Sequence, residues 1–180
     1  HEQPNTAELF QIWVNLPKAE KFANPHFSML WSEDVPIVRI PDAAHRITEV
    51  TVAAGTLGGL RPPPPPPESW ASKPEADVAI WRIAMEPGAQ WVLPASQGPD
   101  TLRVLYVFEG DRVTVGGQSF AGKRGVLLRG PRDVLLEAGP TEVQILMLQG
   151  RPIGEPVVQY GPFVMNDRAG IEQAFADYRR

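Results

Sequence analysis

Short apolar stretches separated by glycine, proline and aspartate recur along the chain and limit it to an antiparallel β fold. Within each stretch apolar side chains alternate with polar ones or occupy both faces, as in strands that pack against a core. We predict strands at residues 9–16, 37–40, 46–54, 78–85, 102–108, 126–128, 134–136 and 143–148. Short strands spaced by roughly ten residues, with turn residues between them, are typical of an antiparallel sandwich or barrel. The predicted fold class is therefore all-β.

The stretch 102–117 predicts a β-hairpin, with its turn at Glu109-Gly110-Asp111 between two alternating patterns. Its first arm is apolar on both faces, which predicts a barrel-wall strand covered inside and out. Helices are expected in two places only. A short one should occupy residues 18–23, after Pro17, and a C-terminal one should begin near Asp167, capped by Asn166 or Asp167.

Composition excludes several classes of function. The chain has 180 residues, a net charge of -4 and no cysteine. It therefore lacks the excess of basic residues that nucleic-acid binding needs, and disulfides, thiolate zinc sites and a cysteine nucleophile are excluded. No run of about 18 apolar residues is present to span a membrane. We expect a cytoplasmic protein with no direct nucleic-acid or membrane partner. Because the chain opens on His1-Glu2 without a methionine, we expect it to begin inside a longer protein.

Six consecutive prolines, residues 62–67, predict an extended polyproline segment without backbone donors. Two interpretations are open. The segment could dock a proline-binding partner, or it could be a stiff surface loop that carries the chain across the barrel, with Trp70 fixing its far end. The second interpretation is favoured, because stiff proline-rich spacers are common.

The stretch 102–117, with the Pro87-Gly88 turn before it, resembles the first motif of the cupin superfamily. The motif's glycines fit, but its metal ligands do not: Arg103 stands at the glutamate position, and residues 96–99 (SQGP) cover the two histidine positions. A cation at this place opposes metal binding. If Arg103 points inward, it needs a carboxylate or carbonyl partner, and Asp133 in the second motif is the acidic candidate. Otherwise it lies at the barrel mouth in water.

Two longer motifs resemble the pirin family, whose members are bicupins of two stacked barrels. They are QIWVNLP at residues 11–17 and the stretch 150–166, which ends in GPFVMN. The resemblance implies an antiparallel cupin barrel with a C-terminal helix. It implies that residues 46–180 form the C-terminal cupin domain, and that residues 1–45 connect it to the protein's own N-terminal cupin, carrying the edge of that barrel's metal site.

The same resemblance implies where metal would bind. Pirins hold a divalent metal in the N-terminal barrel through an H-x-H element and an H-x-E element shortly before the QLWVN strand. Glu2 is the candidate glutamate, and His1 is either the spacer beside it or itself the ligand. Iron, nickel or manganese is thus expected only together with the N-terminal cupin, and none in this chain alone. His26 is expected to be a hydrogen-bonded packing residue rather than a ligand.

Two functional classes follow from the resemblance. One is a quercetin 2,3-dioxygenase-type enzyme, in which Glu2 accepts the hydroxyl proton of a flavonol or similar small aromatic substrate. The other is a non-enzymatic regulatory protein, a transcriptional co-regulator or redox sensor. We favour the enzyme for the intact protein and expect this chain alone to be inactive.

Overall fold

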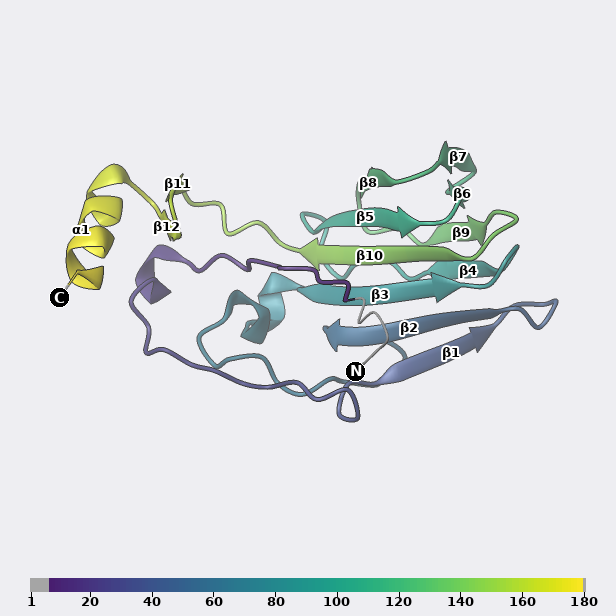
Figure 1. Cartoon of the computed structure of the whole chain (residues 1–180), viewed down its shortest axis with the longest axis horizontal. Coiled ribbons are helices and arrows are strands. Elements are labelled where there is room, and N and C mark those ends of the chain that lie inside the picture. The colour runs from purple at the N-terminus through teal and green to yellow at the C-terminus, as the bar shows by residue number, and fades with distance from the viewer. Residues whose placement is uncertain (1–6, 180) are drawn as a thin grey trace, which may run out of the picture.

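The computed structural model describes residues 7–179, and its strands form two antiparallel sheets that face each other (Figure 1). The larger sheet has the order β1-β2-β3-β10-β5-β8 and the smaller β4-β9-β6-β7. The bounds are β1 Ile37–Pro41, β2 Ile47–Ala54, β3 Ala79–Met85, β4 Gln90–Leu93, β5 Leu102–Glu109, β6 Arg112–Val115, β7 Gln118–Ala121, β8 Arg124–Leu128, β9 Val134–Ala138 and β10 Val143–Gly150. The all-β prediction is confirmed.

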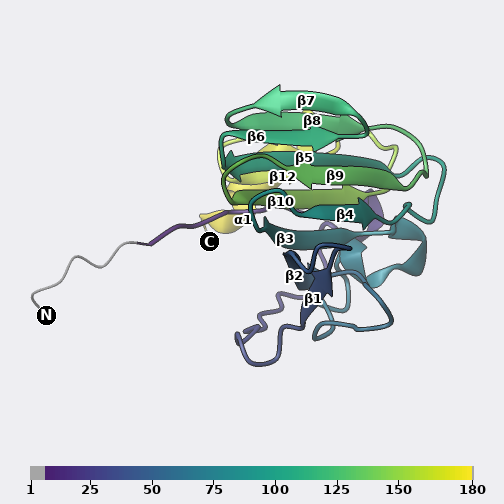
Figure 2. The same ribbon diagram turned by 90° about the vertical axis from the view of Figure 1, so that its right-hand side faces the viewer.

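The core lies between the two sheets, where alternate residues of each strand point inward. Figure 2 shows the strands stacked from β7 and β8 down to β1. Fully buried side chains come from both sheets, among them Val50, Ile83 and Ile145 from the larger and Val113 and Leu136 from the smaller. This two-layer burial follows directly from the period-two pattern of the sequence.

A second, smaller core lies in the C-terminal segment. It is formed by β11 (Val158–Tyr160), β12 (Phe163–Met165) and α1 (Arg168–Tyr178), around Met165, Ile171 and Ala174. Figure 1 shows this unit beyond the end of β10, away from the two sheets. The predicted cap is confirmed, since the Asp167 carboxylate accepts a hydrogen bond of 2.8 Å from Gly170 N. No helix within residues 7–179 has the length and apolar character needed to cross a membrane.

The predicted hairpin at residues 102–117 is wrong. β5 belongs to the larger sheet and β6 to the smaller, so the turn at Gly110 carries the chain from one sheet to the other. β5 cannot pair with β6, because β10 and β8 already occupy both of its edges. The hairpin is instead β6–β7, joined by Gly116-Gly117 with φ of 56° and 83°, angles that suit a tight primed turn.

β5 is also not buried on both faces. Arg103, Leu105 and Val107 point inward and are buried, whereas Tyr106 on the outer face is 44% exposed. Part of that outer face is covered by Phe10, whose ring stands edge-on to Phe108 with a centroid distance of 4.8 Å.

The N-terminal segment differs from both of its predictions. Residues 9–16 pair with no strand among residues 7–179, because Phe10 packs across the face of β5 instead of aligning along a sheet edge. The predicted helix at 18–23 is only a short 3-10 turn, η1 (Lys18–Glu20). Two further 3-10 turns, η2 (Trp70–Ser72) and η3 (Pro74–Ala76), follow the proline run.

Candidate functional site

Arg103, which the resemblance to the first cupin motif aligns with a metal ligand, lies inside the molecule. It is 1% exposed, and its Nη1 and Nη2 donate to the carbonyl oxygens of Pro94 and Arg132, each at 2.6 Å. Burial lowers the pKa of Arg103, while the nearby carboxylates of Asp77 and Asp133 act in the opposite direction. The inward position and a carbonyl partner were among the predicted alternatives. Asp133 is not the hydrogen-bond partner, because its Oδ1 accepts from Ala95 N at 2.7 Å.

Asp77 and the groups that donate hydrogen bonds to it form a second polar centre, in addition to Arg103 and its partners. Asp77 has a positive φ of 48° just before β3, and each of its carboxylate oxygens accepts hydrogen bonds. The donors are Gln97 N at 2.9 Å, Gly98 N at 3.3 Å, Thr101 Oγ1 at 2.7 Å and Gln149 Nε2 at 2.9 Å. Asp77 thus ties the loop before β5 to the end of β10. Sequence reasoning missed it, because its donors come from two segments that lie more than 15 residues away along the chain, and two of them are backbone N–H groups.

These residues do not fit a metal ion. Among residues 7–179 no three His, Asp or Glu side chains gather in a way that could hold one. The buried guanidinium of Arg103 would also repel a cation placed beside it, since like charges repel strongly in a buried site. His26 is exposed and lies 2.8 Å from Ser28 Oγ, a hydrogen bond without a role in packing. His1 and Glu2, the predicted ligand candidates, lie outside the described residues.

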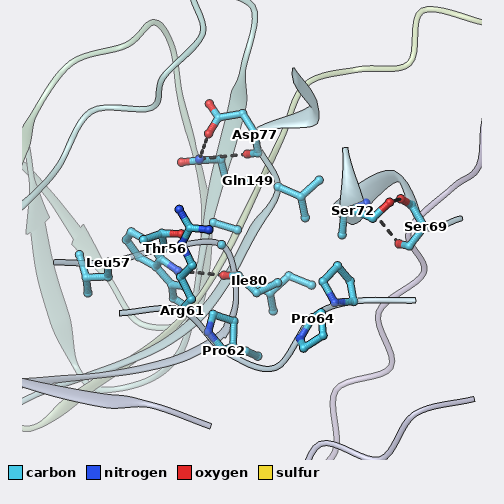
Figure 3. A pocket seen from close by; sticks show the side chains of 18 of the residues that line it. Thr56, Leu57, Arg61, Pro62, Pro64, Ser69, Ser72, Asp77, Ile80 and Gln149 are labelled. Atoms are coloured by element: carbon cyan, nitrogen blue, oxygen red, sulfur yellow. Dashed lines mark hydrogen bonds between the residues drawn. The ribbon is translucent and has the colours of Figure 1, made fainter. Parts of the chain in front are cut away.

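Beside this polar centre lies a cavity of about 990 Å³, which we call the proline-walled cavity. Five prolines of the run, 62–66, form one wall, and the end of β2, the loop after it and the start of β3 form the other. Figure 3 shows Arg61 between the prolines on one side and Asp77 and Gln149 on the other. The cavity volume is within the range of small-molecule sites.

Several contacts hold the proline run in place. Trp70 Nε1 donates to the carbonyl of Arg151 at 2.9 Å, so Trp70 does fix the far end, as the surface-loop interpretation predicts. Ser72 Oγ donates to the carbonyl of Pro67 at 2.6 Å. Lys73 Nζ lies 2.7 Å from Glu20 Oε1, and this hydrogen bond raises the pKa of Lys73. The wall is therefore tied both to β10 and to the N-terminal segment.

We expect Thr101→Val to lower the free energy of unfolding by about 2 kcal/mol, because it removes a buried hydrogen bond to the Asp77 carboxylate. Thr48→Val is the matched control: Thr48 Oγ1 is equally buried and has no partner within residues 7–179, so its replacement should be neutral or stabilising. Thermal unfolding of both variants checks the pair. Equal losses of stability in the two variants would show that the hydrogen bond from Thr101 to Asp77 does not stabilise the protein.

Two solved structures share the arrangement of sheets. A quercetin 2,3-dioxygenase from Acinetobacter baumannii superimposes with a TM-score of 0.77 at 24% identity, over 93% of this chain and 54% of that one. GK1651 from Geobacillus kaustophilus gives a TM-score of 0.58 at 25% identity, over 81% of this chain and 54% of the other. The family model of the pirin C-terminal cupin domain matches residues 80–180. The chain belongs to the pirin family.

Curated relatives match nearly the whole chain. "Putative quercetin 2,3-dioxygenase PA2418" of Pseudomonas aeruginosa is 34% identical over 174 residues, which is 96% of this chain and 56% of that protein. Pirin-1 of Arabidopsis thaliana is 34% identical over 176 residues, 94% of this chain and 55% of that protein. The chain thus spans a little over half the length of these relatives.

Proposed function

We propose that the intact protein is a metal-dependent enzyme of the quercetin 2,3-dioxygenase type, acting on a flavonol or a similar small aromatic compound, and that this chain is its C-terminal, metal-free half. The observation that carries the proposal is the 34% identity, over 96% of this chain, to a relative that bears the name of a quercetin 2,3-dioxygenase. The buried Arg103 supports the assignment of this chain to the metal-free half. Iron, nickel or manganese would then belong to the other half, because the residues described in this one do not fit a cation.

The surface of the N-terminal segment supports the presence of that other half. Many large apolar side chains are exposed there, among them Trp13 at 55%, Phe22 at 69%, Phe27 at 82% and Trp31 at 58%. So many exposed apolar side chains in one segment favour an interaction site. We propose that residues 1–45 connect the two halves, with the N-terminal cupin covering these side chains, and that residues 46–180 form the C-terminal domain.

In this proposal Glu2 is the residue of this chain that takes part in the reaction, as the acceptor of the flavonol hydroxyl proton, and it is also a metal ligand beside His1. A general base of this kind typically accelerates a reaction by about 10² to 10⁴-fold. The rest of the chain contributes indirectly, by completing the enclosure of the neighbouring site.

The test is flavonol loss and dioxygen uptake by the intact protein supplied with iron, nickel or manganese. We expect turnover by the wild type, a fall of at least about 100-fold in Glu2→Gln, and no change in His26→Ala, whose side chain is exposed and bonds only to Ser28 among the described residues. Metal-replete intact protein without turnover would refute the enzymatic proposal. It would favour the alternative, a non-enzymatic regulatory protein, which relatives named pirin keep open.

A further inference from the structure

We infer that the proline-walled cavity is a binding site for a small planar aromatic carboxylate, with Arg61 as the residue that holds the carboxylate. The site lies entirely in this chain and needs no metal, so it goes beyond the proposed enzymatic function. The chemical class of the ligand follows from the residues that line the cavity.

The walls of the cavity favour an apolar, flat ligand. Proline has no N–H, so the wall formed by residues 62–66 presents ring faces and no backbone donors. The opposite wall includes Leu57, Val78 and Ile80. Extended polyproline segments pack well against aromatic rings, because their conformation is already fixed before binding. Trp81 also lines the cavity; it is 4% exposed, and its Nε1 already donates to the carbonyl of Ala54 at 3.1 Å.

The charges in the cavity favour an anion. Arg61 has no hydrogen bond or ion pair with any residue from 7 to 179, whereas the other cation, Lys73, is paired with Glu20. The carboxylate of Asp77 is already satisfied by donors on both of its oxygens. Among the described residues, Arg61 is therefore the cation of the cavity lining that has no partner.

The position of Arg61 suits a carboxylate attached to a ring. Figure 3 shows its side chain extending from the start of the proline run towards the part of the cavity near Thr56 and Gln149. A guanidinium binds a carboxylate through two parallel hydrogen bonds and also stacks on aromatic faces, which lysine does not do equally well. A ligand whose aromatic ring packs on the prolines while its carboxylate binds Arg61 uses both the apolar wall and the unpartnered guanidinium. A cavity of about 990 Å³ has room for two fused rings.

The experiment is calorimetric titration of the 180-residue chain with 2-naphthoate and with the neutral 2-naphthylmethanol. We expect 2-naphthoate to bind at least about tenfold more tightly than the alcohol, and Arg61→Gln to remove that difference, since a charge-assisted bidentate pair is lost. Arg61→Lys should retain part of it. Arg129→Gln is the control, because Arg129 is exposed and outside the cavity lining.

Arg61 is exposed, so its replacement should not disturb folding. Three results would overturn the inference: no detectable binding of 2-naphthoate by the wild type, equal binding of the acid and the alcohol, or unchanged binding by Arg61→Gln. Because the measurement uses neither metal nor turnover, it can fail while the proposed enzymatic function holds, and the reverse is also true.

Discussion

Replacing Gly110 with alanine is expected to destabilise the protein by about 4 kcal/mol. Gly110 has φ of +110°, which side-chain-bearing residues rarely adopt. A Cβ there would lie 2.8 Å from the carbonyl oxygen of Glu142 and 3.0 Å from Val143 Cγ2. Both atoms belong to the segment that begins β10, a central strand, so the clash cannot be relieved without moving the turn that joins the two sheets.

Gly122→Ala is the control that separates the effect of the steric clash from the cost of a side chain at positive φ. Gly122 also has a positive φ, +64°, but a Cβ there would meet nothing within 4 Å. It should therefore cost only about 1 kcal/mol, the price of a left-handed residue. Urea unfolding of the two variants gives the comparison. Similar losses of unfolding free energy in both variants would mean that a Cβ at Gly110 can be accommodated without a clash.

Replacing Arg103 with leucine is expected to lower the free energy of unfolding by about 3 kcal/mol, which corresponds to a fall of about 6 to 12 °C in Tm for a chain of this size. The change removes the part-buried hydrogen bonds that the guanidinium donates to the carbonyls of Pro94 and Arg132. Relief of the desolvated charge offsets part of that loss. The loss of two hydrogen bonds from a charged donor nevertheless dominates, because each contributes about 1.5 to 3 kcal/mol.

The matched control is Arg124→Leu. Arg124 also donates to a carbonyl, that of Ala121 at 3.1 Å, but it is exposed and its partner is three residues away. Water can replace that bond, so a change within about 0.5 kcal/mol is expected. A thermal scan that shows no loss for Arg103→Leu would place the Arg103 side chain at a hydrated barrel mouth, the other alternative that the sequence leaves open.

The six strands of the larger sheet, together with β6 and β9, were predictable, because the alternation of apolar residues shows which side chains a core buries. The strands β4, β7, β11 and β12 were not predicted, and residues 9–16 form no strand. The same pattern does not record which sheet a strand joins. Residues 102–108 and 112–115 alternate as a hairpin would, yet they belong to different sheets, because β10 and β8 occupy the edges of β5. The pairing of β5 depends on β10, which lies about 40 residues further along the chain. A local sequence pattern therefore cannot predict which strand pairs with β5.

The candidate site was less predictable than the fold. The cupin resemblance located Arg103, but its partners are main-chain carbonyls, which leave no mark in side-chain identity. From the sequence alone, the proline run could be read either as a docking site for a partner or as a stiff surface loop. The structure anchors its far end through Trp70, yet also makes it the wall of a cavity, because segments distant in sequence meet there.

Metal content of the purified 180-residue chain tests the central claim, that this half of a pirin carries Arg103 in place of a metal. The chain would be loaded with iron, nickel or manganese, desalted and measured for metal per chain. We predict a ratio near zero, because His1 and Glu2 alone would provide too few ligands and no three candidate ligands gather within residues 7–179. A ratio near one, retained after desalting, would contradict the account.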